Sequence, residues 1–248
     1  MPELRLTRHG DVARVIIDRP ERKHAWSVSM WTQMARLMGR CARDVSIRVV
    51  LVTSTGERVF SAGADIEQFG GAGPASVRES LKGVESVMAS IEACPQPVIA
   101  VVSGAAVGAG TEVAAACDIR IASDRAWFSI PAATLGIVIT KNDIARLVRG
   151  VGGSMARDML LTGRRLTARE AERIGFVRSI HSAADLDGAA MDLAAEVASL
   201  DGSAQEAMKA HLNDLGAVRW DEEAWGASLE AITSPTTQRR IMARLGDT

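Results

Sequence analysis

The sequence predicts an α/β fold followed by a helical C-terminal region. Up to Gly153, short apolar runs typical of buried strands alternate with Gly-rich turns and with segments in which apolar residues recur every three to four positions. After Gly153 only the helical periodicity continues. With 248 residues the chain is long enough to bury one sizeable core. We therefore expect residues 1–190 to form the α/β core and residues 191–248 a C-terminal helical region.

The composition is typical of a globular protein and argues against one class of partner. Hydrophobic residues make up 47% of the chain and charged residues 24%, with a formal net charge of −1. A nucleic-acid binder would carry a surplus of basic residues, which this composition lacks. We therefore expect no nucleic-acid partner.

The cysteine spacing and the lack of an apolar signal segment favour an intracellular compartment. Cys41, Cys94 and Cys117 are an odd number, lie far apart and lack CxxC spacing, so neither a disulfide framework nor a zinc site is indicated. The N-terminus is charged and alternating, without an apolar signal segment. The longest apolar run is too short and too rich in glycine to span a bilayer. We expect a cytoplasmic protein with no membrane partner and no metal.

The chain is predicted to open as a ββαβ unit. Residues 4–6 and 12–17 alternate or run apolar on either side of Gly10, which indicates a β-hairpin. Ser27 is a predicted N-cap for a helix, because apolar residues then recur at helical spacing. Residues 49–52 follow as a buried strand.

Strands, Gly-rich loops and helices then alternate quickly. The predicted order is a Gly-rich loop over 70–74, a helix over 77–91, a strand over 98–102, a loop over 104–110, a helix over 111–116 and a strand over 119–122.

The C-terminal part is predicted to be helical. Thr167 and Glu170 form a capping box that begins a helix ending near Gly175. Further helices are predicted over 185–200, 203–215 and 221–245, with a break at Pro235.

Two segments share one design, VFSAGADI over 59–66 and SGAAVGAGTEV over 103–113. Each carries a buried strand end into a run of Gly and Ala that enters a helix, which leaves backbone N–H groups unpaired at a positive helix end. Side by side, the two segments would direct one N–H each at a single oxygen and form an oxyanion hole. For either segment alone, tight helix-on-strand packing explains the small residues equally simply.

Taken together, four segments resemble the enoyl-CoA hydratase/isomerase (crotonase) superfamily. The segment RPERKHAWS resembles the family's early RPexxNAL element, and FSAGADI matches its first oxyanion segment. The segment GAAVGAGTEVAAACDIRIAS matches the second oxyanion segment, and LTGRRLTAREAERIGFV matches a later helix-turn element. The resemblance implies a crotonase-like spiral of ββα units followed by a C-terminal helical region.

The resemblance also implies roles for individual residues. The N–H groups of Ala64 and Ala109 would hold the thioester oxygen of an acyl-CoA, so CoA would be part of the substrate and no separate cofactor is expected. Residues implied to lie along CoA are Ala25, Ala62, Asp65 and Ile66, with Arg22 and Lys23 beside its phosphates. Exposed basic residues are more often simply solvated, and Asp118 matches a family position that we expect to be structural.

The acid/base residues follow the family only in part. In family hydratases two glutamates flank the double bond, and the first corresponds to Glu112, which lies three residues after Ala109 on the same helix face. The second corresponds to Ala132, and the PGxGG turn is replaced by residues 139–143. Lys141 and Asp143 lie near this departure, but a helix start with Thr140 as N-cap accounts for both.

Several functions remain open at this stage. The leading hypothesis is reversible hydration of a trans-2-enoyl-CoA with Glu112 as general acid/base, which would make the protein a lyase of fatty acid metabolism. Isomerisation needs only one carboxylate, and loss of the second glutamate also suits a non-catalytic acyl-CoA binder. A nicotinamide enzyme ranks low, because Val113 stands where the dinucleotide-binding fingerprint has its third glycine. A serine hydrolase ranks lower still, because the sequence has no GxSxG motif.

The resemblance further implies a homotrimer or a dimer of trimers, with 191–248 as the trimerisation region. The C-terminal helices would pack near a neighbour's site. Candidate contacts are Trp220, Trp225, Arg239 and Arg240.

Overall fold

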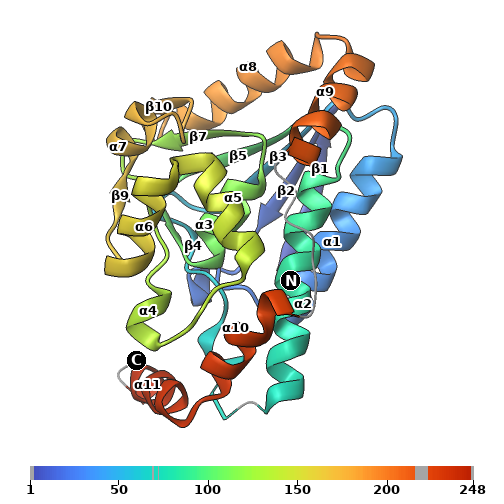
Figure 1. Cartoon of the computed structure of the whole chain (residues 1–248). Helices are drawn as coiled ribbons and strands as arrows, with labels where there is room; N and C mark the ends of the chain where they lie inside the picture. The colour runs from blue at the N-terminus through green and yellow to red at the C-terminus, as the bar shows by residue number, and fades with distance from the viewer. Residues whose placement is uncertain (1–2, 69, 72, 216–222, 247–248) are drawn as a thin grey trace.

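The computed structural model describes residues 3–68, 70, 71, 73–215 and 223–246, and its strands form two sheets (Figure 1). The larger sheet has the order β1-β2-β3-β5-β7-β10, and the smaller has the order β4-β6-β8-β9. The strands of the larger sheet are β1 (Leu4–His9), β2 (Val12–Ile17), β3 (Val49–Ser54), β5 (Val98–Val102), β7 (Ile119–Ser123) and β10 (Ser179–His181). Those of the smaller sheet are β4 (Val59–Ser61), β6 (Ala105–Val107), β8 (Trp127–Ser129) and β9 (Leu166–Thr167).

Helices cover and connect these sheets. They are α1 (Val28–Arg43), α2 (Pro74–Glu92), α3 (Ala109–Ala116), α4 (Ala132–Leu135), α5 (Lys141–Val151), α6 (Gly153–Thr162), α7 (Ala168–Arg173), α8 (Leu186–Ala198), α9 (Gly202–Leu215), α10 (Glu223–Thr233) and α11 (Pro235–Gly246). Two short 3₁₀ helices, η1 (Pro20–Arg22) and η2 (Ile66–Gln68), precede α1 and α2. The chain is therefore the predicted α/β core with a helical C-terminal part.

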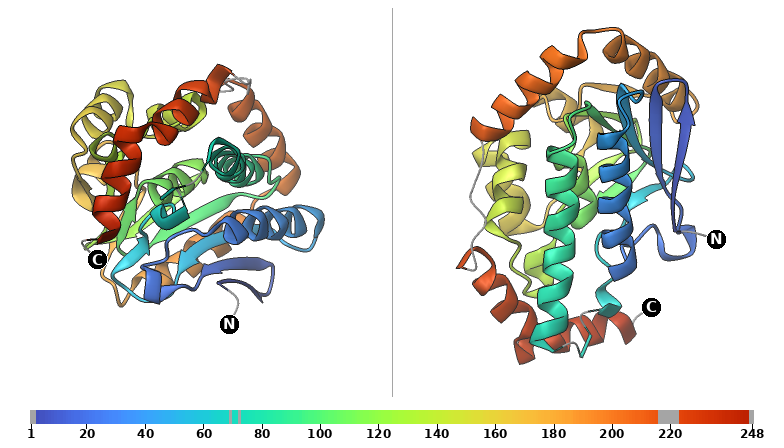
Figure 2. Two further views of the ribbon diagram at one scale, coloured as in Figure 1. Left: turned by 90° about the horizontal axis from the view of Figure 1, so that it is seen from below. Right: turned by 90° about the vertical axis from the view of Figure 1, so that its right-hand side faces the viewer.

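The main core lies where α1, α2 and α3 pack on the sheets. Helix α1 buries Met30, Met34 and Met38 on one face, since residues four apart share a helix face. The rings of Trp26 and Trp31 stack with centroids 4.6 Å apart at the start of this helix. Helices α1 and α2 run side by side, as both Figure 1 and Figure 2 show. A rigid α/β body thus supports the loops that follow the strands.

The ββαβ opening and the capped helices are confirmed. Strands β1 and β2 pair antiparallel around Gly10, and Ser27 caps α1 as predicted. The Thr167 capping box begins α7, and Pro235 separates α10 from α11. These elements have strong local signals, so tertiary context did not alter them.

The prediction of a loop over 104–110 is wrong. Residues 105–107 form β6, which pairs parallel to β4 and β8, and α3 begins at Ala109 rather than at Thr111. Gly104 permits this pairing, because a Cβ there would lie 2.1 Å from the Arg58 carbonyl oxygen. The Gly- and Ala-rich composition is typical of a loop, but it also allows close strand pairing. Strands β8, β9 and β10 were not predicted either, since two or three residues carry little periodicity.

The last helices occupy two places in the molecule. Helix α8 packs on the outer face of the larger sheet through Leu186, Ala190 and Leu193, so the predicted boundary at residue 190 falls inside this helix. Helices α10 and α11 lie at the opposite end, against α2, α4 and η2 (Figures 1 and 2). The C-terminal hairpin α10–α11 thus covers residues of its own chain that follow the first Gly-rich segment.

Lys209 anchors α9 to the core. Its Nζ donates to Asp118 Oδ2 at 2.7 Å and to the carbonyl oxygens of Ile91 and Gln96. Asp118 Oδ2 also accepts the backbone N–H of Val98. Because the carboxylate is shared between a strand and a distant helix, its role in this structure is architectural.

Candidate active site

The two Gly-rich segments lie side by side. A Cβ at Gly63 would be 2.7 Å from the carbonyl oxygen of Val107 and 3.3 Å from the backbone nitrogen of Ala109. A Cβ at Gly110 would be 2.7 Å from the carbonyl oxygen of Ser61. Both glycines are needed for this close packing, so the packing explanation of the small residues is correct. The same packing brings the backbone of Ala64 and that of Ala109 to one place.

The N–H groups of Ala64 and Ala109 are available to a ligand. Within the described residues neither group donates a hydrogen bond, although the neighbouring N–H of Asp65 bonds to the Trp26 carbonyl oxygen. Ala109 is the first residue of α3, where an N–H has no intrahelical partner. Two unpaired donors in adjacent segments match the arrangement that an oxyanion hole requires.

The loop before α1 is held against β4 by His24. Its Nδ1 accepts the backbone N–H of Arg19, and its Nε2 contacts the carbonyl oxygen of Thr55 at 2.9 Å. Because Nδ1 is an acceptor, the proton lies on Nε2 and the ring is neutral. Burial lowers the pKa of His24, which favours the same state. The carbonyl oxygen of His24 accepts the Ser61 hydroxyl, so the loop and the first oxyanion segment form one unit.

The residues implied to contact CoA lie around this unit. Ala62 N–H bonds to the Lys23 carbonyl oxygen, and the Ala25 carbonyl oxygen accepts from Arg19. Asp65 is buried and accepts from Arg19 Nη1 at 2.9 Å, so its side chain holds the loop. Ile66 begins η2 and is half-buried.

The two basic candidates differ in their surroundings. Arg22 forms an ion pair with Glu67, and both side chains are about half exposed. Lys23 is exposed and has a positive φ of 51° at the end of η1. Any phosphate bound at Arg22 would compete with Glu67, whereas Lys23 has no ion pair among the described residues.

Glu112 lies in the first turn of α3 and is 5% exposed. Within the described part of the chain its carboxyl has no hydrogen-bond partner. Burial raises the pKa of Glu112 well above its usual value, and the negative charge of Asp143 raises it further, while Arg146 opposes the shift. A desolvated carboxyl with a raised pKa, one turn after the Ala109 N–H, is a candidate for proton exchange with a substrate.

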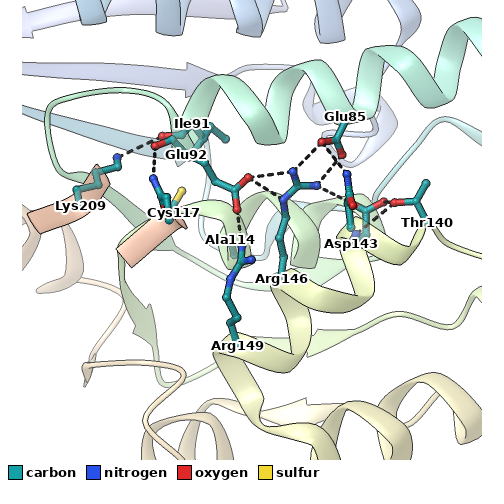
Figure 3. Close-up of polar contacts among 12 residues, drawn as sticks. Glu85, Ile91, Glu92, Ala114, Cys117, Thr140, Asp143, Arg146, Arg149 and Lys209 are labelled. Atoms are coloured by element: carbon teal, nitrogen blue, oxygen red, sulfur yellow. Dashed lines mark hydrogen bonds and ion pairs between the residues drawn. The ribbon is translucent and has the colours of Figure 1, made fainter. Parts of the chain in front are cut away.

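Helices α2 and α5 carry an ionic cluster, which Figure 3 shows. Charges of this cluster act on the pKa of Glu112. Arg146, 5% exposed, donates to both oxygens of Glu85 at 2.7 and 2.9 Å. It also donates to Glu92 Oε2 from Nε and Nη2, and to Asp143 Oδ1 at 3.1 Å. Arg149 binds the other oxygen of Glu92. We call these five residues, Glu85, Glu92, Asp143, Arg146 and Arg149, the arginine cluster.

Asp143 has a capping role as predicted. The Thr140 hydroxyl oxygen accepts the Asp143 backbone N–H, and the hydroxyl donates to Asp143 Oδ2. Burial raises the pKa of Asp143, while the Thr140 and Arg146 hydrogen bonds lower it. Lys141 is exposed on the same turn. The capping interpretation is confirmed, and the burial of Asp143 beside Glu112 is additional to it.

Ala132 begins α4 and is half-buried against the main core. No carboxyl therefore stands at the position that corresponds to the second family glutamate. The Ile139 to Asp143 turn that replaces PGxGG ends in the Thr140 cap of α5. Sequence patterns did not single out Arg146, Glu85 or Glu92, because each alone resembles a solvated helical charge. One sequence signal groups Glu85 with Glu92. They are seven residues apart, so on a helix they lie on the same face two turns apart.

An apolar cluster borders the first oxyanion segment. Val77 and Leu81 of α2 pack with Ile232 of α10 and Ile241 of α11. The half-buried residues packed against them are Ala64, Ile137, Leu229 and Leu245. Ala64 thus faces an apolar wall formed by its own C-terminal hairpin. Trp220 lies outside the described residues, and so does the side chain of Trp225; Arg239 is exposed and donates to Thr236.

Comparison with known proteins identifies the family. The enoyl-CoA hydratase/isomerase family model matches residues 7–240, so the chain belongs to that family and has the crotonase fold. The chain is 35% identical over 194 residues to a short-chain-enoyl-CoA hydratase of Clostridium acetobutylicum, covering 78% of this chain and 74% of that protein. It is 35% identical over 206 residues to a carnitinyl-CoA dehydratase of Proteus mirabilis, covering 83% and 78%.

A solved structure agrees over nearly the whole chain. The crystal structure of an enoyl-CoA hydratase/isomerase from Xanthobacter autotrophicus Py2 superimposes with a TM-score of 0.89 at 28% identity. The match covers 99% of this chain and 94% of that chain.

Among the helices described here, none has the length and apolar character needed to cross a lipid bilayer.

Proposed function

We propose that the protein catalyses reversible hydration of a trans-2-enoyl-CoA, with CoA as part of the substrate. The observation that carries the proposal is the position of Glu112, a buried carboxyl on α3 one turn after the free N–H of Ala109. Membership of the enoyl-CoA hydratase/isomerase family supports an acyl-CoA thioester as the substrate. The names of two relatives, a hydratase and a dehydratase, refer to the same type of reaction.

The thioester would bind with its carbonyl oxygen at the N–H groups of Ala64 and Ala109. These donors stabilise the negative charge that develops on that oxygen when C3 is attacked, and one such donor is typically worth about 2.7–4 kcal/mol. Because they belong to the backbone of two packed segments, they need no reorganisation during the reaction. Ala25, Ala62, Asp65 and Ile66 would border CoA, with Lys23 and Arg22 near its phosphates.

Glu112 would transfer the protons. Its carboxylate takes a proton from water as the water oxygen bonds to C3, and the carboxyl then gives a proton to C2 as the enolate collapses. One proton enters and one leaves the enzyme in each turnover. General acid–base catalysis of this kind typically contributes about 10²- to 10⁴-fold to the rate.

A second reaction is favoured by the alanine at 132. Moving a double bond from C3=C4 to C2=C3 requires removal of a proton from C2 and addition of a proton to C4, which a single carboxyl can perform. Isomerisation of a 3-enoyl-CoA is therefore the alternative within the same site. A protein that binds acyl-CoA without turnover is the remaining alternative, and the burial of Glu112 argues against it.

The first test follows loss of the conjugated thioester absorbance after mixing with a short trans-2-enoyl-CoA. We expect turnover by the native protein and a loss of about 10²- to 10⁴-fold in Glu112→Gln, with binding of a saturated acyl-CoA retained. A 3-enoyl-CoA in the same assay tests isomerisation. Equal rates for the native protein and Glu112→Gln would overturn the assignment of Glu112, and binding with no turnover of either substrate would establish the non-catalytic alternative.

We also propose a homotrimer or a dimer of trimers. The family resemblance supports it, and sedimentation of the full chain tests it. Helices α10 and α11 already pack on their own chain, so a neighbour would contact the outer face of this hairpin.

A further inference from the structure

Around Glu112 and the arginine cluster, four carboxyls face two arginines, so the group would carry two excess negative charges if every carboxyl were ionised. A guanidinium has five N–H donors. In Arg146 two are directed at Glu85, two at Glu92 and one at Asp143. The donors of Arg146 are therefore all used, and none reaches Glu112.

Two arginines do not balance these carboxyls. Glu85, Glu92 and Asp143 all bind Arg146, and Glu92 also binds Arg149. Glu112 adds a further carboxyl, and Asp143 and Glu112 are the most deeply buried, 3% and 5% exposed. Glu112 and Asp143 stand in the first turns of α3 and α5, and these two helices pack against each other. Two carboxylates buried between packed helices cannot both be ionised at low cost, which favours a pair that holds one proton.

Within the described part of the chain, Arg146 is the cation that acts on Glu112. The charged groups that act on it are Asp143 and Arg146 of α5 and Glu85 of α2. Strands β4 and β6, which also pack on α3, contain no titratable side chain. The charged residues of α6 are engaged elsewhere, since Asp158 binds Arg164 and Arg157 donates to the Gly153 carbonyl oxygen. In α10, Glu230 is exposed.

The side chain of Asn142, next to Asp143, gives separate evidence that a hydrogen-bond donor binds near the arginine cluster. It is 5% exposed, and its Nδ2 donates to Glu85 Oε1. Its Oδ1 is buried and has no partner within the described residues. A buried acceptor without a donor is rare in folded proteins, and a water or substrate hydroxyl would satisfy it.

We propose that Asp143 is a positioning residue for proton transfer, sharing a single proton with Glu112 and so supplying the second carboxyl that position 132 lacks. This inference rests on the proposed function. Arg146 and Thr140 hold Asp143 in place by one hydrogen bond each. In hydration, Glu112 gives the shared proton to C2 and regains a proton from the water that bonds to C3. The pair therefore begins and ends each turnover with one proton.

The test uses Asp143→Asn in the full chain, with Asp158→Asn as the matched control. Asparagine keeps the shape and the Thr140 hydrogen bond but removes the charge. Asp158 is also an arginine-paired aspartate on a helix, and it lies outside the site. The pH dependence of kcat/KM is measured for each protein, together with the binding of a saturated acyl-CoA.

We expect the inflection assigned to Glu112 to move to lower pH by about one unit or more in Asp143→Asn, because removing a neighbouring negative charge makes Glu112 easier to ionise. The inflection moves to lower pH whether activity requires the ionised or the protonated form of Glu112. Binding of the acyl-CoA should be unchanged, and Asp158→Asn should keep the native profile. Asp143→Ser removes the same charge and serves if the asparagine variant fails to fold.

A second measurement does not depend on turnover. Infrared spectra at neutral pH should show the C=O stretch of a buried protonated carboxyl in the native protein and a weaker band in Asp143→Asn. An unshifted pH profile together with an unchanged band in a folded variant would overturn the inference and leave the proposed hydratase intact. Absence of turnover in the native protein would instead contradict the proposed function, and the infrared band would still decide whether the proton is shared.

Discussion

The two halves of the candidate site are built by different means. The thioester side consists of backbone N–H groups in two packed segments, with Gly63 and Gly110 allowing their close approach. The proposed proton-transfer side consists of side chains, in which charged residues of α2 and α5 act on the pKa of Glu112 on α3. One half therefore depends on the absence of side chains and the other on which charges surround a buried carboxyl.

This difference explains how the family's features are distributed in the chain. Backbone donors require only small residues and a fixed loop path, so the thioester side closely resembles the family pattern. A proton-transferring group can be supplied from several elements, so the alanine at 132 and the altered turn at 139–143 are compatible with an intact site. Variants that affect one half alone test whether the two halves of the site depend on different features of the structure.

The largest effect is expected from Arg146→Leu, which acts on the proton-transfer half. Removing the guanidinium leaves the buried carboxylates of Glu85, Glu92 and Asp143 without their shared cation, which typically costs about 3–5 kcal/mol of unfolding free energy. Chemical denaturation measures it. Arg125→Leu is the control, since Arg125 and Glu57 are mostly exposed and 3.9 Å apart, and surface pairs contribute only about 0–1 kcal/mol. Equal stability of the two variants would mean that the arginine cluster is not structural.

Gly63→Ala acts on the thioester half. The new Cβ would lie 2.7 Å from the Val107 carbonyl oxygen and push the two segments apart. Loss of one well-placed donor lowers kcat by about 10²- to 10³-fold. Gly56→Ala is the matched control, because Gly56 also has positive φ, 73°, but has open space around its Cα. If both alanine variants lost activity equally, backbone strain and not the oxyanion geometry would be responsible.

The smallest effect is expected from Ala132→Glu. Adding the second family glutamate to a scaffold that retains Glu112 should raise the hydration rate by about tenfold, at the lower end of what an added acid/base contributes. The initial rate with a trans-2-enoyl-CoA measures it, and Ala132→Gln controls for side-chain size. An unchanged rate would indicate that the 139–143 turn has displaced the reacting atoms from position 132.

Features with short-range causes were predictable from the sequence. Ser27, Thr140 and Thr167 cap the helices that they were expected to cap, and the hairpin closes at Gly10. Strand β6 was read as a loop because its Gly and Ala residues gain their pairing from β4 and β8, which the local pattern does not contain. The family and the crotonase fold followed from motifs that lie in order along the chain.

The sequence by itself determined the helix caps, the two small-residue segments and the family. The tertiary structure decided that α10 and α11 pack against Ala64 of the first segment, that Arg146 binds three carboxylates, and that Glu112 is buried. The physical reason is the separation along the chain of the residues that interact. Capping and periodicity depend on residues within one or two turns, whereas desolvation and charge depend on every element that packs against a group, whatever its distance along the chain.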